Sequence, residues 1–213
     1  RGLGVVPGDI DNDGDMDIYV ANDKDMNLLF INNGKGRFTE KALLMGVGFN
    51  GNGLAEAGMG VDFGDVNRDG WMDIFVTNFS GETNTLYLNK KSGFLVDATL
   101  ETGLGKPSIP FLAFGTKFVD LNLDGWLDIY VANGHVIDNI NLFNREFQHA
   151  QTNQVFINQG NGTFIDKTNM IGGDVLKSAV SRGVAFGDID NDGDIDFIVS
   201  NNNDKAELLL NDG

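Results

Sequence analysis

The chain has 213 residues, a formal net charge of −16 at pH 7 and no cysteine. The lack of cysteine excludes disulfides, thiol chemistry and thiolate metal sites, and 15 scattered Lys and Arg residues argue against nucleic acid as a partner. No run approaches about 18 consecutive apolar residues, so no membrane insertion is expected.

The first predicted strand begins at Gly2 and leads into residues 9–17, with the sequence D-I-D-N-D-G-D-M-D. Nearly the same nine residues recur at 65–73, 120–128 and 188–196, and the shared formula is D-x-(D/N)-x-D-G-x-x-D. We call these segments loops 1 to 4. A glycine stands five positions before each loop, at Gly4, Gly60, Gly115 and Gly183. This self-similarity predicts a chain built from four repeats.

Each loop carries oxygen-bearing side chains at positions 1, 3, 5 and 9. Oxygens at alternate positions of a tight loop can converge, and glycine at position 6 lets the backbone turn sharply. Ca²⁺ takes six to eight oxygen ligands at about 2.3–2.6 Å, so the pattern predicts about four bound Ca²⁺. The loops hold 16 of the 31 acidic residues, and much of the negative charge therefore belongs to these sites.

The loops differ from EF-hand loops, although both open in a similar way. An EF-hand needs a bidentate Glu at position 12 and helices on both flanks. Position 12 of these loops is a valine in every case, namely Val20, Val76, Val131 and Val199. The flanking segments are rich in β-branched and aromatic residues, which excludes the EF-hand interpretation.

Two apolar runs that end in asparagine follow each loop. The first runs are residues 18–22, 74–78, 129–133 and 197–201, and the second runs end at Asn32, Asn89, Asn158 and Asn211. Runs of this composition predict strands. Turns with glycine follow the second run in the first three repeats and lead to a further strand that begins at Phe38, Phe94 or Phe164. Each repeat is therefore predicted as a four-stranded antiparallel unit, at about 2–50, 51–110, 111–178 and 179–213.

A single sheet of this kind cannot bury both faces, so neighbouring units must stack. Radial stacking gives an all-β fold, a β-propeller of four-stranded antiparallel blades. A linear stack is the alternative, and it would leave exposed edges. The fourth repeat stops at residues 211–213, before its fourth strand. We therefore expect a fragment of about four blades from a larger propeller in preference to a closed four-bladed ring.

Residues 183–201 (G-V-A-F-G-D-I-D-N-D-G-D-I-D-F-I-V-S-N) resemble the FG-GAP/VCBS-type repeat, which also builds the calcium-bearing propeller of integrin α-chains. All four units fit this repeat. Residues 132–135 (A-N-G-H), the insert up to Gln154 and the final repeat resemble the ASPIC/UnbV, or cartilage acidic protein, group. The resemblance implies a propeller of seven blades, with further blades in the same protein.

The resemblance also implies a role for each loop position. Positions 1, 3, 5 and 9 would donate side-chain oxygens, position 7 its backbone carbonyl, and position 9 would be a bidentate carboxylate. The implied metal ligands are Asp9, Asp11, Asp13, Asp15 and Asp17 in loop 1, Asp65, Asn67, Asp69, Trp71 and Asp73 in loop 2, Asp120, Asn122, Asp124, Trp126 and Asp128 in loop 3, and Asp188, Asp190, Asp192, Asp194 and Asp196 in loop 4. Position 3 is Asp in loops 1 and 4 but Asn in loops 2 and 3, which predicts tighter binding at the outer loops.

These features predict a calcium-stabilised scaffold for extracellular binding, adhesion or structure. Extracellular calcium modules bind with dissociation constants of about 10⁻⁴–10⁻³ M, which favours a secreted, periplasmic or cell-surface location. The partner would be a protein or carbohydrate ligand, or other blades and domains of the same chain. The alternative is a propeller domain of a secreted or biosynthetic enzyme that acts on carbohydrate or polyketide substrates.

Two weaker signals lie between the third and fourth loops. His135 and His149 are the only histidines, and no nucleophile-elbow sequence accompanies them, so no catalytic residue is predicted. The segment 134–153 lengthens the third repeat, and residues 142–147 within it are expected to form a short helix. An insert of this kind is typical either of a binding loop or of a structural element.

Overall fold

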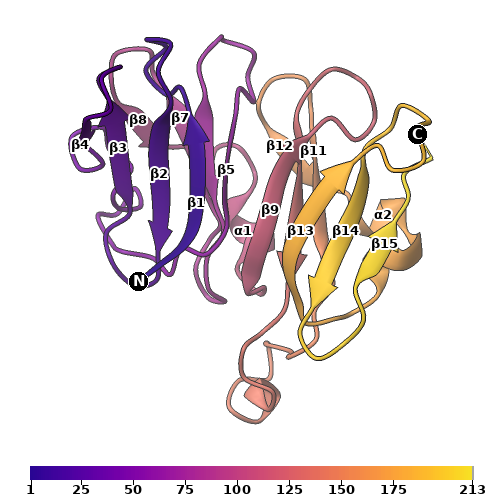
Figure 1. The fold of residues 1–213 in the computed structure, drawn as a ribbon. Helices are drawn as coiled ribbons and strands as arrows, with labels where there is room; N and C mark the ends of the chain where they lie inside the picture. Colours follow the sequence, from indigo (N-terminus) through magenta and orange to yellow (C-terminus); the bar gives the residue numbers. More distant parts are fainter. Residues whose placement is uncertain (213) are drawn as a thin grey trace.

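The computed structural model describes residues 1–212, which form four antiparallel sheets (Figure 1). Blade 1 contains β1 (Gly2–Gly8), β2 (Asp17–Asn22), β3 (Leu28–Asn32) and β4 (Phe38–Glu40). Blade 2 contains β5 (Val61–Gly64), β6 (Asp73–Val76), β7 (Thr85–Asn89) and β8 (Leu95–Asp97). Blade 3 contains β9 (Ala113–Val119), β10 (Asp128–Asn133), β11 (Gln154–Asn158) and β12 (Phe164–Asp166). Blade 4 contains β13 (Ser181–Gly187), β14 (Asp196–Asn201) and β15 (Glu207–Leu209).

Helical structure is confined to short turns between strands. These are α1 (Gly105–Ser108), α2 (Thr168–Ile171) and the 3₁₀ segments η1 (Ile140–Leu142) and η2 (Gly173–Leu176). Among the described residues, no helix has the length and apolar character needed to cross a membrane.

Strands within each blade pair in chain order as an antiparallel meander. The first strands of successive blades are in contact, β1 with β5, β5 with β9 and β9 with β13. Figure 1 shows these four strands in succession across the middle of the view, with the other strands of each blade fanning away from them. The fold is therefore an all-β propeller arrangement with four-stranded antiparallel blades, as predicted, and the fourth blade has three described strands.

The hydrophobic core lies between the blades in three clusters, one for each pair of neighbours. Successive side chains of a strand point to opposite faces of the sheet, so a strand of an inner blade contributes to two clusters. In β6, Ile74 and Val76 pack toward blade 1, whereas Phe75 packs toward blade 3. All four residues of β6 are buried. This two-sided burial explains why the second strands read as continuous apolar runs instead of alternating ones.

The recurring glycine before each loop allows neighbouring blades to approach closely. A Cβ atom at Gly4 or Gly60 would overlap the carbonyl oxygen of Met59 or Phe114, each in the next blade, and one at Gly115 would lie 2.8 Å from the carbonyl oxygen of Arg182. Gly183 has no such neighbour, since the nearest atom to its Cβ position is Oγ of Ser200 in its own sheet, at 3.1 Å. The repeated glycine is thus a packing requirement of the blade interface.

The insert 134–153 between β10 and β11 contains η1 instead of the expected helix at 142–147. The amide of Glu146 donates to Oδ1 of Asn144 at 2.9 Å, so the asparagine side chain takes an amide that would otherwise continue the helix. Leu142 and Phe143 are each 77% exposed and provide no buried face to stabilise a helix. The helix prediction for 142–147 was wrong for this reason.

Candidate metal centres

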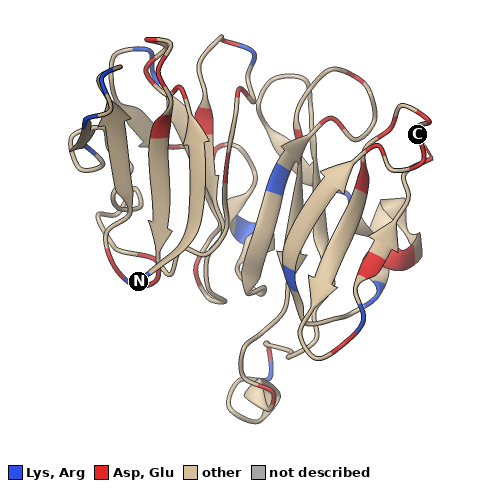
Figure 2. Cartoon of the chain, in the orientation of Figure 1, with Lys and Arg blue, Asp and Glu red and all other residues tan. Residues whose placement is uncertain are grey.

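All four loops lie on the same rim of the molecule. Each loop connects the first strand of its blade to the second, and the first strands run in the same direction (Figure 1). Figure 2 shows Asp and Glu along this rim, at the ends of β1, β5, β9 and β13. The fold therefore places four acidic loops beside one another.

Backbone hydrogen bonds to side-chain oxygens give each loop its shape. In loop 1, the carboxylate of Asp9 accepts the amides of Asp13 at 3.1 Å and Gly14 at 3.0 Å. The same pair of bonds recurs at position 1 of loops 2, 3 and 4. The carboxylate at position 5 accepts the amide of position 7 in all four loops. Gly14 has φ +92°, a left-handed conformation that explains the glycine at position 6.

The aspartate at position 9 is the most deeply buried part of each loop. Asp17, Asp73, Asp128 and Asp196 are all 0% exposed. In loop 2, Asp73 accepts the amide of Val66 at 3.1 Å with one oxygen and the amide of Asn89 at 2.9 Å with the other. The other three loops make the corresponding two bonds. Position 9 thus joins the loop to the end of the third strand.

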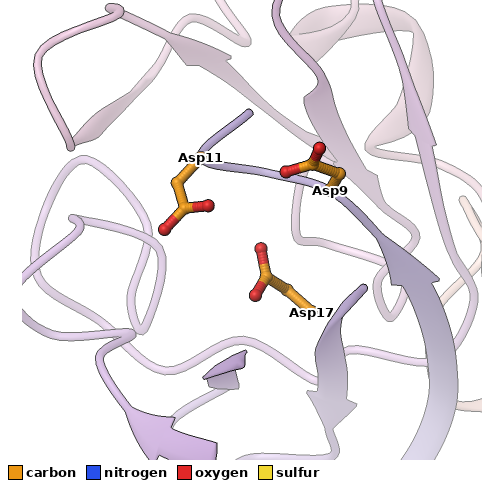
Figure 3. Close-up of side chains that lie close together, drawn as sticks. All are labelled: Asp9, Asp11 and Asp17. Carbon is orange, nitrogen blue, oxygen red and sulfur yellow. The ribbon is translucent and has the colours of Figure 1, made fainter. Parts of the chain in front are cut away.

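The structure brings three carboxylates together in each outer loop. In loop 1 the ligand oxygens of Asp9, Asp11 and Asp17 lie within 4.8 Å of one another, and Figure 3 shows the three side chains pointing toward a common space. Asp188, Asp190 and Asp196 form the same group in loop 4. In loops 2 and 3 position 3 is an asparagine, whose side-chain oxygen accepts the amide of position 5 at 3.1 Å.

The remaining predicted positions play other observed roles. Asp13 and Asp192, at position 5, hold the amides of Asp15 and Asp194. Trp126, at position 7, lies under the guanidinium of Arg68, with 4.6 Å between the carbon of that group and the ring centroid. The role of position 7 as a carbonyl ligand stays a prediction.

Burial makes negative charge unfavourable in these loops. It raises the pKa of Asp73 to about 7 and that of Asp128 to about 6. Burial also raises the pKa of Asp11, with added repulsion from the neighbouring carboxylates of Asp17, Asp13 and Asp9. The pKa of Asp196 is lowered instead, because the amides of Asn211 and Ile189 donate to it. Among the residues that the structure describes, Oδ1 of Asp11 is buried and has no hydrogen-bond partner. A cation would satisfy this oxygen and relieve the repulsion.

In buffer with a chelator, we expect the free energy of unfolding to fall by about 2 kcal/mol between pH 5 and pH 7. The pKa of folded Asp73 is about 7 and the ordinary value is 3.8. Across this range the folded protein therefore holds more protons than the unfolded chain, and stability decreases as pH rises. Urea unfolding at several pH values measures the slope. A rise in stability over the same range would contradict the prediction.

His135 lies beside the hydroxyl group of Ser80 but is not arranged as a general base for it. His135 is fully buried, and its Nδ1 accepts the amide of Ile137 at 3.0 Å. The proton of the neutral ring therefore resides on Nε2, which lies 3.2 Å from Oγ of Ser80 and donates to it. Burial lowers the pKa of His135 further. The ring holds Ser80 in place and offers it no lone pair.

The asparagines at the ends of the third strands were not assigned a functional role from the sequence, although their regular recurrence was visible there. The asparagines that end β7 and β11, and Asn211 after β15, occur at the same place in each repeat. Their side-chain amides donate to carbonyl oxygens in the loop of the preceding blade. The regular recurrence of asparagine was the available signal, but its partner in another blade could not be read from one repeat.

Comparison with solved structures shows a distant similarity. The chain is similar to a lectin from Agrocybe aegerita, described for specific recognition of non-reducing terminal N-acetylglucosamine, with 19% sequence identity and a TM-score of 0.41. The similarity covers 98% of this chain, which spans 66% of the length of the lectin chain. The search among curated proteins found no match.

A family model for the FG-GAP-like repeat matches the sequence three times, at residues 9–76, 65–131 and 120–199. Each match runs from position 1 of one loop to the second strand of the next blade. The matches overlap and together cover residues 9–199, which include all four loops. On this evidence, and on the propeller arrangement of its sheets, the chain belongs to the family of FG-GAP-like repeat proteins.

Proposed function

We propose that this chain is a calcium-binding propeller domain that serves as an extracellular scaffold for binding, adhesion or structure. The observation that carries the proposal is the group Asp9, Asp11 and Asp17, whose ligand oxygens lie within 4.8 Å of one another. Among the described residues, Oδ1 of Asp11 is also buried without a hydrogen-bond partner. Three carboxylates at this distance are unfavourable unless a cation or protons neutralise them.

The chemistry of the donors favours Ca²⁺. The expected ligand positions offer oxygen atoms, from carboxylates, amide side chains and backbone carbonyls, and oxygen is the donor that hard cations such as Ca²⁺ prefer. Mg²⁺ demands nearly ideal octahedral geometry and keeps several waters, whereas Ca²⁺ accepts carboxylates, amide oxygens and backbone carbonyls in flexible arrangements. Positions 1, 3, 5 and 9 would hold the ion with side chains and position 7 with its carbonyl. When bound, the ion supplies positive charge that joins the ends of the first and second strands.

The calcium affinity expected for such sites supports the proposed extracellular location. Sites of this kind in extracellular modules bind with dissociation constants of about 10⁻⁴–10⁻³ M and are loaded by calcium outside the cell. The domain has no cysteine for disulfide stabilisation, so ions would provide the cross-links that hold each blade. Its partner would be a protein or carbohydrate ligand, or further blades and domains of the same protein.

Calorimetric titration of the metal-free protein with Ca²⁺ tests the proposal. We expect about four sites in two classes, with the two outer loops tighter because they contribute one more carboxylate than the inner loops. A titration without heat, performed in two buffers of different ionisation enthalpy, would contradict calcium binding. Mg²⁺ at the same concentrations provides the matched control and is expected to bind much more weakly.

Single substitutions in the loops show which loops form the tight class of calcium sites and which form the weak class. Asp11→Asn or Asp190→Asn leaves an outer loop with the same number of carboxylates at positions 1, 3, 5 and 9 as an inner one and should weaken one tight site by roughly fivefold to tenfold. Asn67→Asp makes the reverse change in loop 2 and should tighten one weak site. Unchanged affinities in all three variants would refute the assignment by charge.

A further inference from the structure

Hydrogen bonds cross every blade boundary and join one aspartate loop to the next. The side-chain amide of Asn89 donates to the carbonyl oxygen of Ile10 at 2.9 Å. Asn158 makes the same bond to Val66 at 2.9 Å, and Asn211 to Leu121 at 2.9 Å. Each acceptor is position 2 of the preceding loop, between the expected ligands at positions 1 and 3. The position of the asparagine is therefore tied to the backbone around the neighbouring site.

The same asparagines also hold the aspartate at position 9 of their own loops. The backbone amide of Asn89 donates to Asp73 at 2.9 Å, and those of Asn158 and Asn211 donate to Asp128 and Asp196 at 2.8 and 3.0 Å. One residue thus contacts two successive loops. Its side chain reaches the preceding loop and its backbone amide binds its own loop, to which the side chains of Asn89 and Asn158 also donate, at Met72 and Leu127, at 3.2 and 3.1 Å. In blade 1, Asn32 donates its side chain to Met16 of its own loop at 3.2 Å.

A second link joins loops 1, 2 and 3 at their tips. Asn12, at position 4 of loop 1, donates its side-chain amide to the carbonyl oxygen of Gly70, at position 6 of loop 2, at 2.8 Å. Arg68 makes the corresponding bond from loop 2 to the carbonyl oxygen of Gly125 in loop 3. Position 4 of loop 3 is Leu123, which has no side-chain donor. The first two boundaries therefore have two links and the third has one.

We infer that these bonds couple the four sites, so that occupation of one loop favours binding at its neighbours, most strongly among loops 1, 2 and 3. The inference rests on the proposed calcium function. An ion fixes the backbone at positions 1 to 3 of its loop, and this orders the asparagine that holds position 9 of the next loop. The second ion then binds to a loop that is already ordered, so its binding costs less conformational entropy. Direct repulsion between the cations acts in the opposite sense, so the sign of the coupling identifies its origin.

The two tryptophans of the chain lie at position 7 of loops 2 and 3 and serve as local reporters. In a Trp126→Phe background, Trp71 is the remaining tryptophan, and its fluorescence reports calcium binding at loop 2. Asp11→Ala removes one expected ligand from loop 1 and leaves in place the hydrogen bonds that Asp9 accepts from the amides of Asp13 and Gly14. We expect this change to weaken calcium binding at loop 2 by about fivefold or more, the range of typical coupling between sites.

Breaking the links should remove this effect. With Asn12→Leu and Asn89→Ala combined, Asp11→Ala is expected to change loop 2 affinity by less than about twofold. Asn12→Leu alone introduces the residue found at the same position of loop 3, at an exposed site, and should reduce the effect partly. Asn32→Ala is the matched control, because its bonds stay within blade 1, and should leave the fivefold effect intact.

The outcomes separate this inference from the calcium proposal. An equal effect of Asp11→Ala with and without the links, or an increase of affinity at loop 2, would overturn the coupling while leaving calcium binding in place. A fluorescence signal and a titration heat that both fail to respond to Ca²⁺ in the parent protein would overturn the calcium proposal itself.

Discussion

Removal of calcium with a chelator is expected to lower the melting temperature of this domain by more than about 10 °C. At Ca²⁺ concentrations of about 10 to 100 times the dissociation constant, each site stabilises the folded state by roughly 1.4–2.7 kcal/mol. Four sites together contribute several kcal/mol, and each kcal/mol shifts the midpoint by about 2–4 °C in a domain of this size. The unfolded loops lack the converging geometry and gain little from the ion.

Thermal unfolding followed by circular dichroism, in about 10 mM CaCl₂ and in EDTA, measures this shift. Mg²⁺ in place of Ca²⁺ controls for ionic strength and for general screening of the acidic rim. Equal midpoints in CaCl₂ and EDTA would show that the loops keep their shape without the ion, and the structural role would be refuted.

Gly60→Ala is expected to lower the free energy of unfolding by about 3 kcal/mol or more. The added methyl group would overlap the carbonyl oxygen of Phe114 and would also lie 2.9 Å from Oγ1 of Thr77. The carbonyl belongs to the first strand of blade 3, so relief of the overlap requires β5 and β9 to separate. Such a movement would loosen the core cluster between blades 2 and 3.

Gly183→Ala provides the matched control. This glycine holds the same place in its repeat, but its nearest neighbour is Oγ of Ser200, a side chain that can rotate. We expect a change within about 1 kcal/mol in urea unfolding. Similar losses in the two variants would show that the penalty arises from strand propensity and not from contact between blades.

The sequence predicted the repeat and its strands because both depend on local patterns. The apolar run at residues 18–22 appears as β2, and the glycine of position 6 adopts the left-handed conformation that a tight loop needs. The predicted all-β propeller is confirmed by the four sheets of the structure. It could be predicted because four such units have few other ways to cover their apolar faces. The closer likeness to the ASPIC/UnbV group and the presence of further blades stay predictions.

The parts that could not be predicted depend on neighbours distant in the sequence. The burial of Asp73 arises from packing that no single loop reveals, although this burial sets its pKa. The bond from Asn89 to Ile10 spans 79 residues, and nothing in either segment specifies the other. In the insert, the side chain of Asn144 accepts the amide of Glu146, and the short helix expected at 142–147 does not form.

Because β1, β5, β9 and β13 run in the same direction, the two rims of the domain should differ in how well they tolerate inserted residues. Every connection from a second to a third strand leaves the rim opposite the aspartate loops, and the segment 134–153 is the longest of them (Figure 1). The free energy of closing such a connection grows only slowly with length. Foreign peptides or tags are therefore best placed within the segment 134–153, next to Leu142 and Phe143, which are each 77% exposed, where added chain would lie away from every aspartate loop.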